Sequence, residues 1–407
     1  MTLPSSTTST RLSTIYTPLW QPYQLSMEIG SNKTSDTTTT IYSRQYSHVY
    51  SLRLRELKSK CLENAPDGIK RTNRVLELQE DGITCVITGT IVKERDGGDP
   101  LAEHSNCLTN DTLVLEDESG RVQLLFPQNT TVHLYCTGVV VGVVGKLLGG
   151  GVFDVEQIIT PKLLLPNKIP QESDAKVLFL SGLDCGNPDI SGITRDMLIL
   201  YLQGHLIDKA KNVCRVVILG NSIHSPDGCQ ELDDFVAQIL SSGIPVDLLP
   251  GQDDPTTANW PQRPLHSSLL KCSGTFASLS RPPNPYMCEM DHVHLLGCDG
   301  KNITDLQQQI FPPLSSLECM IRTLTWSHIL PTGPASTPMV PSDESDVFCL
   351  ATLPHLYAAG NCDSFDTCLF EDRVRCVCVP KFSNSGQGVL VSLAGTMECE
   401  LLQFEDE

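Results

Sequence analysis

The hydrophobic pattern along this chain changes twice, and each change predicts a different kind of structure. From Tyr42 onward, apolar residues recur at spacings of three and four as far as Cys61, which places them on one face of a helix. Between about 76 and 160, the apolar positions instead fall in short β-branched runs separated by turns such as Glu118-Ser119-Gly120. Beyond about 174, short apolar strands alternate with amphipathic helices.

The β-branched runs predict a small barrel. Gly89 lies inside the first run, where a glycine suits a strand that bends around a barrel corner. About five strands without an intervening helix favour a closed barrel, most simply an OB-fold. The predicted strands cover residues 83–92, 112–116, 122–125, 132–144 and 152–159.

The alternating pattern that follows predicts a layered α/β domain. Its predicted strands are Val177–Leu180, Val213–Leu219 and Ile244–Leu249, and the helix before the third strand ends at Gly243, which suits a left-handed helix terminus. In open α/β sheets, ligands bind at the carboxyl ends of the strands, so the loops that follow these strands are the candidate site.

With 407 residues, the chain is too long for one ordinary domain. We expect a flexible Ser/Thr-rich extension over residues 1–40, in which Trp20 and Tyr23 could contact the body, and a helix with the OB-fold over 41–165. A proline-containing linker over 161–174 then leads to an α/β domain over 174–407.

The charge balance argues against a protein that binds nucleic acid by itself. The formal net charge is −19, whereas affinity for a phosphate backbone comes largely from Lys and Arg. The barrel runs contain few aromatic residues and several acidic ones, so we favour protein contact there, with single-strand binding as an alternative. A cluster of basic residues is interpreted as a solvated helix face in preference to a DNA-binding patch; it comprises Arg44, Arg53, Arg55, Lys58, Lys60, Lys70, Arg71 and Arg74.

No apolar run is long enough to span a bilayer, and the start of the chain lacks the pattern of a secretion signal, so we expect cytoplasm or nucleus and no membrane contact. The 17 cysteines are then expected to be mostly reduced core thiols. No Cys-x-x-Cys pair is present; the nearest candidates are Cys376-x-Cys378 and Cys362 with Cys368, and a zinc site is disfavoured.

Four short segments at predicted strand ends resemble the metal-binding loops of two-metal phosphoesterases. That family supplies Asp-x-His, Gly-Asp-x-x-Asp, Gly-Asn-His-Asp/Glu and Gly-His-x-His, whose side chains converge on ions about 4 Å apart. The corresponding segments contain Gly182 and Asp184, Asn221 and His224, Gln252-Asp253-Asp254, and Asn361 and Asp363.

Each of the four segments departs from the family pattern. Gly182 offers no side chain where the first Asp is expected, and Asn221 is neutral where an Asp would bridge both ions. Asp253 stands in place of a histidine and would repel a phosphodiester. Asn361 and Asp363 stand in the segment of the last two histidines, so no imidazole remains there. We therefore expect no bound metal or other cofactor and no catalytic residue.

Three other interpretations stay open. A working metal-dependent phosphodiesterase or nuclease could use an altered ligand set of Asp184, His224, Asp253, Asp254 and Asp363. The pair His292 and His294 could bind a metal, but it is interpreted as the middle of a strand with a structural role. Ser181 and Ser222 are weak candidates for a hydrolase nucleophile, because neither lies in Gly-x-Ser-x-Gly.

The chain also resembles the small, B-type regulatory subunits of eukaryotic DNA polymerase delta, in order from about residue 41 to about 395. The segments that carry the resemblance are Ser43-Arg44-Gln45-Tyr46 with His48, Leu113 to Glu118, Ser181-Gly182-Leu183, Leu219-Gly220-Asn221, Pro250 to Pro255 with Pro261 to His266, Asn284-Pro285-Tyr286, and Gly360-Asn361 with Ser364-Phe365.

This resemblance implies an OB-fold joined to an inactive calcineurin-like metallophosphoesterase α/β sandwich. It implies a noncatalytic scaffold in the nucleus, acting in DNA replication and repair synthesis. The expected partners are the catalytic subunit, through its C-terminal metal-binding domain, and the third accessory subunit, which leads to the sliding clamp; DNA is expected to be contacted only through the complex. Two features depart from the delta pattern: a short stretch between Gly186 and Val213, and two acids at Asp253-Asp254 where one is expected.

Overall fold

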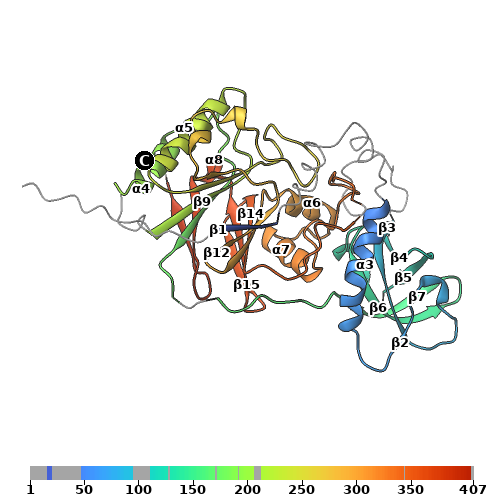
Figure 1. Ribbon diagram of the computed structural model, residues 1–407. Coiled ribbons are helices and arrows are strands. Elements are labelled where there is room, and N and C mark those ends of the chain that lie inside the picture. Colours follow the sequence, from blue (N-terminus) through green and yellow to red (C-terminus); the bar gives the residue numbers. More distant parts are fainter. Residues whose placement is uncertain are drawn as a thin grey trace, which may run out of the picture. The chain divides into compact units, whose positions relative to one another are not determined.

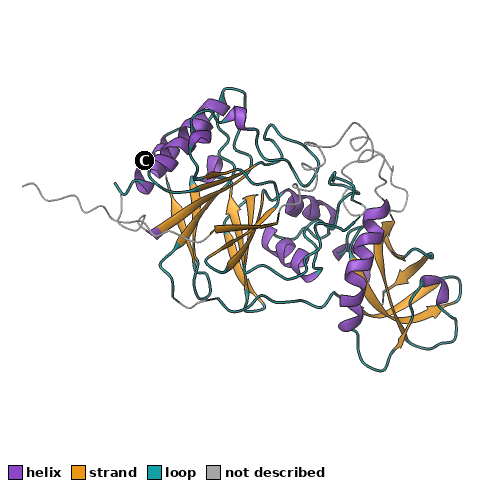
Figure 2. Cartoon of the chain, in the orientation of Figure 1, coloured by secondary structure: helices purple, strands orange, loops and turns teal. Residues whose placement is uncertain are grey.

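The computed structural model describes residues 16–20, 47–94, 111–126, 129–169, 172–190, 192–205, 212–342 and 344–404 (Figures 1 and 2). These residues form two compact units. The barrel unit consists of the described residues within Pro22–Pro166 and Asn302–Leu353, and the sandwich unit consists of the others. Tyr23 and the segment Ser43 to Tyr46 lie outside the described residues. No helix in the described ranges is long and apolar enough to span a membrane.

The barrel unit contains the predicted OB-fold. Its sheet has the strand order β2-β3-β4-β5-β7-β6, and β3 also pairs with β6, which closes the barrel. The expected run over 132–144 is not one strand: a 3₁₀ helix over Asn129–Leu134 precedes β6. The strands are β2 Lys70–Arg71, β3 Cys85–Glu94, β4 Thr112–Glu116, β5 Arg121–Leu125, β6 Val140–Leu148 and β7 Val152–Ile159.

Gly89 lies where β3 changes its partner, as the sequence predicted. Residues Cys85–Thr90 of β3 pair with β6, and Thr90–Glu94 pair with β4. A Cβ atom at Gly89 would lie 2.7 Å from Leu115 Cγ and 2.8 Å from the Glu116 carbonyl oxygen. The strand can bend into both neighbours because this position carries no side chain.

Helix α3 (Ser47–Glu63) packs one apolar stripe against the barrel, where Leu54, Leu57 and Cys61 form a buried cluster with Val140 of β6. The expected solvated basic face is only partly correct. Arg55 is exposed, but Arg53 is fully buried. Its burial depends on residues about 280 to 290 positions away in the sequence.

Those distant residues belong to the segment 302–353, which is part of the barrel unit. The expected domain boundaries placed this segment with the domain over 174–407. It contains most of α6 (Lys301–Gln309) and all of α7 (Ser316–Thr325). Helix α7 begins with a capping box, in which the Ser315 hydroxyl accepts from Glu318 N and the Glu318 carboxylate accepts from Ser315 N.

The sandwich unit contains two six-stranded sheets, as expected for a layered α/β domain. The first has the order β1-β12-β13-β14-β16-β15, and the second has the order β11-β10-β9-β8-β17-β18. The first sheet contains β1 Tyr16–Trp20, β12 Tyr286–Met290, β13 Val293–Cys298, β14 Leu356–Cys362, β15 Asp366–Phe370 and β16 Val374–Pro380. The second contains β8 Lys176–Leu180, β9 Val213–Leu219, β10 Val246–Leu249, β11 Leu279–Ser280, β17 Gln387–Ser392 and β18 Cys399–Gln403.

Strand β8 explains why the second sheet is apolar on both faces. Val177 and Phe179 point into the core between the two sheets, while Leu178 and Leu180 belong to the core beneath the helices. Helices α4 (Ile193–Leu202) and α5 (Gly228–Ser241) cover that outer face (Figure 1). A strand buried on both sides has a continuous apolar run instead of alternation. The short helix α8 (Phe382–Ser385) follows β16.

Two sequence expectations differ from the sandwich unit. Residues 16–20 of the expected flexible extension form β1, which pairs antiparallel with β12. Of the two histidines expected on one strand, His294 lies on β13, but His292 lies with Asp291 in the tight turn between β12 and β13, where both have positive φ angles. Both histidine rings lie near the Glu289 carboxylate, at 3.5 and 3.7 Å.

Candidate functional site

The four predicted segments meet at one edge of the sandwich unit. Strands β8, β9 and β10 are parallel neighbours, so the loops after them emerge on the same side. The end of β14 joins them from the other sheet. There the side-chain nitrogen Nδ2 of Asn361 donates to the Leu219 and Asp299 carbonyl oxygens at 3.2 and 2.9 Å. The chain topology therefore brings the four expected loops together. Whether these loops can bind a metal depends on their side chains.

The first position has no room for a metal ligand. Gly182 has a φ of 58°. A Cβ atom there would lie 2.6 Å from Asn361 Oδ1 and closer still to Lys381 Cγ. The Lys381 stem thus covers the place where the family pattern has its first Asp.

The second and third segments bind each other. Asn221 Nδ2 donates to Asp253 Oδ2 at 3.1 Å, and Asn221 Oδ1 accepts from Asp253 N at 3.2 Å. This reciprocal pair uses both polar atoms of the amide that stands where a bridging carboxylate is expected. Gln252 beside it is exposed, and its backbone N–H donates to Asp299 Oδ2 at 2.9 Å.

Asp254 holds two loops together through backbone donors. Its Oδ1 accepts from Ser222 N and Ile223 N, both at 2.8 Å, and its Oδ2 accepts from Gly251 N at 2.7 Å. Burial raises the pKa of this carboxyl to about 6, although the backbone N–H groups favour the charged form. Both carboxylate oxygens are therefore occupied by loop N–H groups.

Asp299 has a similar role, and the sequence reasoning missed it. It is 2% exposed and accepts from Gln252 N and from Lys301 N at 2.9 and 3.1 Å. Burial raises its pKa. The available signal was its place directly after β13, followed by Gly300, whose φ is 87°.

Of the remaining predicted residues, His224 is exposed, whereas Asp184 and Asn361 are partly buried. His224 Nδ1 lies 3.3 Å from Asp184 Oδ1, and Asn187 Nδ2 donates to Asp184 Oδ2 at 2.8 Å. Asp363 is exposed. The Asn361 side-chain oxygen is buried, and no partner for it lies in the described part of the chain. Asp184 therefore contacts His224 and Asn187, which lie nearby in the same group of loops.

Two-metal catalysis needs several ligand atoms that converge on a pair of ions about 4 Å apart. Within the described residues, no three ligand atoms of His, Cys, Asp or Glu at these loops lie within 4.8 Å of one another. Asp254 and Asp299 instead accept hydrogen bonds from backbone N–H groups, and Asp184 and Asp253 accept from side-chain amides. These hydrogen bonds stabilise the loops.

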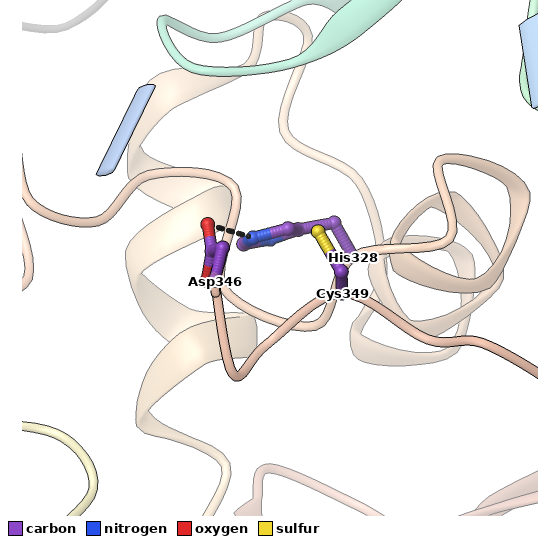
Figure 3. A group of neighbouring side chains, drawn as sticks. All are labelled: His328, Asp346 and Cys349. Atoms are coloured by element: carbon purple, nitrogen blue, oxygen red, sulfur yellow. Dashed lines mark hydrogen bonds and ion pairs between the residues drawn. The ribbon is translucent and has the colours of Figure 1, made fainter. Parts of the chain in front are cut away.

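A different cluster lies in the barrel unit, where His328, Asp346 and Cys349 offer ligand atoms within 4.8 Å of one another. Figure 3 shows the His328 ring directed at the Asp346 carboxylate, with Cys349 beside it. His328 Nδ1 accepts from Leu330 N at 3.2 Å, so Nε2 carries the proton and donates to Asp346 Oδ2 at 2.9 Å. No spacing of these residues in the sequence indicates the cluster.

This cluster of His328, Asp346 and Cys349 has a structural role. Both ring nitrogens of His328 are engaged, and the Arg53 guanidinium donates to the same Asp346 oxygen at 2.7 Å. Burial, together with the nearby Arg53 charge, lowers the pKa of His328 to about 4. Burial and the neighbouring acids raise the pKa of Cys349 well above its usual value. The histidine therefore has no nitrogen free to activate the thiol or to bind a metal.

Comparison with known proteins identifies the family of this chain. Residues 177–367 match the family of B-type subunits of DNA polymerases alpha and epsilon, and residues 45–158 match the OB-fold domain of the DNA polymerase delta subunit. A DNA polymerase delta small subunit from Oryza sativa subsp. japonica is 34% identical over 408 residues, covering 89% of this chain and 93% of that protein. The Arabidopsis thaliana protein of the same name is 32% identical over 89% of this chain and 92% of its own length.

A more distant animal relative gives the same result. The Drosophila melanogaster protein named DNA polymerase delta subunit 2 is 31% identical, covering 89% of this chain and 94% of that protein. Among solved structures, a purple acid phosphatase from yellow lupin has a TM-score of 0.31 and 11% identity, over 80% of this chain and 71% of that chain. On the strength of the sequence relatives and the two matched domains, the chain belongs to the family of DNA polymerase delta small subunits.

Proposed function

We propose that this protein is the noncatalytic scaffold subunit of a nuclear DNA polymerase delta. In this role it links the catalytic subunit, bound through that subunit's C-terminal metal-binding domain, to the third accessory subunit and thereby to the sliding clamp. It meets DNA only as part of the complex, in replication and in repair synthesis. Membership of the small-subunit family is the basis of the proposal.

One observation carries the noncatalytic part of this proposal. Asp254, the acid that could best anchor a metal, uses both oxygens for backbone N–H groups of its own fold. Asp253 is paired with Asn221, and Gly182 is covered by Lys381. We interpret Gly182, Asp184, Asn221, His224, Gln252, Asp253, Asp254, Asn361 and Asp363 as a degenerate phosphoesterase site.

The surface of the barrel unit supports a role in assembly. Leu76 and Ile83 are 76% and 53% exposed, and Leu125 on β5 is 48% exposed. The net charge of −19 disfavours direct binding to a nucleic-acid backbone. Apolar side chains on an acidic protein are more compatible with protein partners than with DNA.

Assembly is tested by isolating the tagged full-length chain from nuclear extract and identifying the retained chains by mass spectrometry. We expect the polymerase catalytic chain and the third subunit in near-equal amounts to the bait. The triple variant Asp253→Ala, His224→Ala, Asp363→Ala should retain the same partners, since these side chains lie at the exposed side of the loops. Isolation without any polymerase catalytic chain would overturn the scaffold proposal.

The alternative, an active phosphodiesterase with an altered ligand set, is tested separately. The purified chain is incubated with Mn²⁺ and an end-labelled single DNA strand, beside the same triple variant. We expect no cleavage by either protein. Cleavage by the unaltered chain that disappears in the triple variant would establish the alternative and contradict the noncatalytic assignment.

A further inference from the structure

Four cysteines that the sequence places close together are brought to adjacent strands of one sheet. Cys362 ends β14, Cys368 lies on β15, and Cys376 and Cys378 lie two residues apart on β16. The proposed function uses none of them. Cys368 faces Cys376 across β15 and β16, and the pKa values of each pair, Cys368 with Cys376 and Cys362 with Cys378, are shifted by the neighbouring thiol.

The two pairs differ in register. Cys368 lies directly opposite Cys376 in the antiparallel pair β15 and β16. Opposed residues in such a pair have Cα atoms about 4.5 to 5.5 Å apart, and a disulfide accepts about 4.4 to 6.8 Å. Cys362 instead has Pro380 as its Cα partner, two residues beyond Cys378. The Cα register of the first pair therefore falls within the range of a disulfide, and the second pair provides a natural comparison.

The two thiols of the first pair also differ in access and charge. Cys376 is fully buried, whereas Cys368 is partly exposed on β15, the last strand of its sheet. The Cys376 hydrogen bond and the Arg375 guanidinium lower the pKa of Cys368 to about 7, while burial and Asp366 raise it. The pKa of Cys376 stays well above its usual value. The pair thus combines a partly exposed thiol whose pKa is lowered with a buried thiol whose pKa is raised.

We propose that Cys368 and Cys376 form a peroxide-reactive dithiol that closes reversibly to a disulfide. The Cys368 thiolate attacks one oxygen of hydrogen peroxide, the O–O bond breaks, and the departing hydroxide takes a proton to become water. The Cys376 sulfur then attacks the resulting sulfenic acid; the S–O bond breaks and a second water leaves with the Cys376 proton. Two thiols are oxidised by two electrons, and one peroxide is reduced to two waters.

The product ties the edge strand β15 to its neighbour. The bond closes a short hairpin whose turn contains Glu371 and Asp372, both with positive φ angles. A dithiol reductant reverses the step by thiol–disulfide exchange. The inference rests on the geometry of the sandwich unit and does not depend on the proposed function.

The test uses the full-length chain at pH 7 with submillimolar hydrogen peroxide. Remaining thiols are alkylated under denaturing conditions, and tandem mass spectrometry of a nonreduced digest assigns the linkages. We expect a Cys368–Cys376 linkage that dithiothreitol removes. We also expect Cys368 to react at least about fivefold faster than the exposed Cys272, whose pKa is raised by Asp233.

Three variants sharpen the result. Cys368→Ser should abolish the linkage, and Cys378→Ser should leave it intact. Cys376→Ser should leave Cys368 as a sulfenic acid that dimedone traps. Because Cys376 is buried, this variant could fail to fold, and the test then depends on Cys368→Ser, whose side chain is partly exposed. A Cys368 that reacts no faster than Cys272, or a dominant linkage between other cysteines, would overturn the proposal.

Discussion

Arg53 shows how one side chain organises the barrel unit. Its Nε donates to Asp346 Oδ2, its Nη1 donates to the carbonyl oxygens of Gly138 and Pro331, and its Nη2 donates to that of Gly333, at 2.7 to 2.9 Å. The planar guanidinium donates four hydrogen bonds to three separate chain segments, whereas a lysine has only three N–H donors. Its partner Asp346 also holds the neutral His328.

The buried His328 makes the stability of the barrel unit depend on pH. Its folded pKa of about 4 lies below the ordinary value of 6.5, so its contribution is complete above pH 6.5 and is lost as the pH falls toward 4. Between pH 7 and pH 5, native-state hydrogen exchange at β6 amides should report a loss on the order of 2 kcal/mol. His328→Gln should reduce this dependence. If the stability of both proteins falls equally between pH 7 and pH 5, the pH dependence does not come from His328.

At the scale of elements, glycine positions decide where strands can bend. Gly89 permits β3 to leave β6 and join β4, and the Glu116 carbonyl oxygen fills the space that a side chain would need. Gly149, in the turn after β6, has no atom within 4 Å of an added Cβ. The two positions therefore form a matched pair that separates close packing from the general effect of losing a glycine.

Gly89→Ala should destabilise the barrel by about 1 to 3 kcal/mol, because an added methyl group meets a backbone oxygen that cannot move without breaking the sheet. Gly149→Ala should change stability by less than about 0.5 kcal/mol, since it meets nothing. Urea unfolding of the two variants, beside the unaltered chain, measures the difference. Equal effects at the two positions would show that close packing at Gly89 is unimportant.

At the scale of the whole molecule, the barrel unit is built from two segments that are distant in the sequence. The segment 302–353 supplies Asp346 and the carbonyl oxygens of Pro331 and Gly333 to Arg53. A buried guanidinium without its carboxylate is an uncompensated charge. The OB-fold therefore needs residues that follow much later in the chain.

A fragment of residues 47–166 should consequently be less stable than the same barrel in the full chain, by about 3 to 5 kcal/mol. Hydrogen exchange at β3 and β6 amides in both proteins provides the comparison. Arg53→Met in the fragment should recover part of the loss, because it removes the unpaired charge while keeping an apolar stem. A fragment as protected as the full chain would show that the segment 302–353 contributes little.

Local patterns were sufficient for much of the fold. The β-branched runs and Gly89 predicted the barrel, and the apolar strands with amphipathic helices predicted the layered α/β domain, because polarity and spacing report directly on which face is buried. The strand-end loops could be located in the same way. The absence of a side chain at Gly182 and the neutral amide at Asn221 are facts of residue type that need no coordinates.

Only the tertiary structure decided which distant residues meet. The burial of Arg53, the His328–Asp346 pair, the β1 pairing with β12 and the opposed Cys368 and Cys376 all depend on register and on contacts across many residues. The same residue types in the same local pattern could be solvated or buried. The sequence by itself determined the elements and the chemistry available at their ends, whereas long-range packing determined which polar groups are paired, because desolvation and hydrogen bonding depend on neighbours in space.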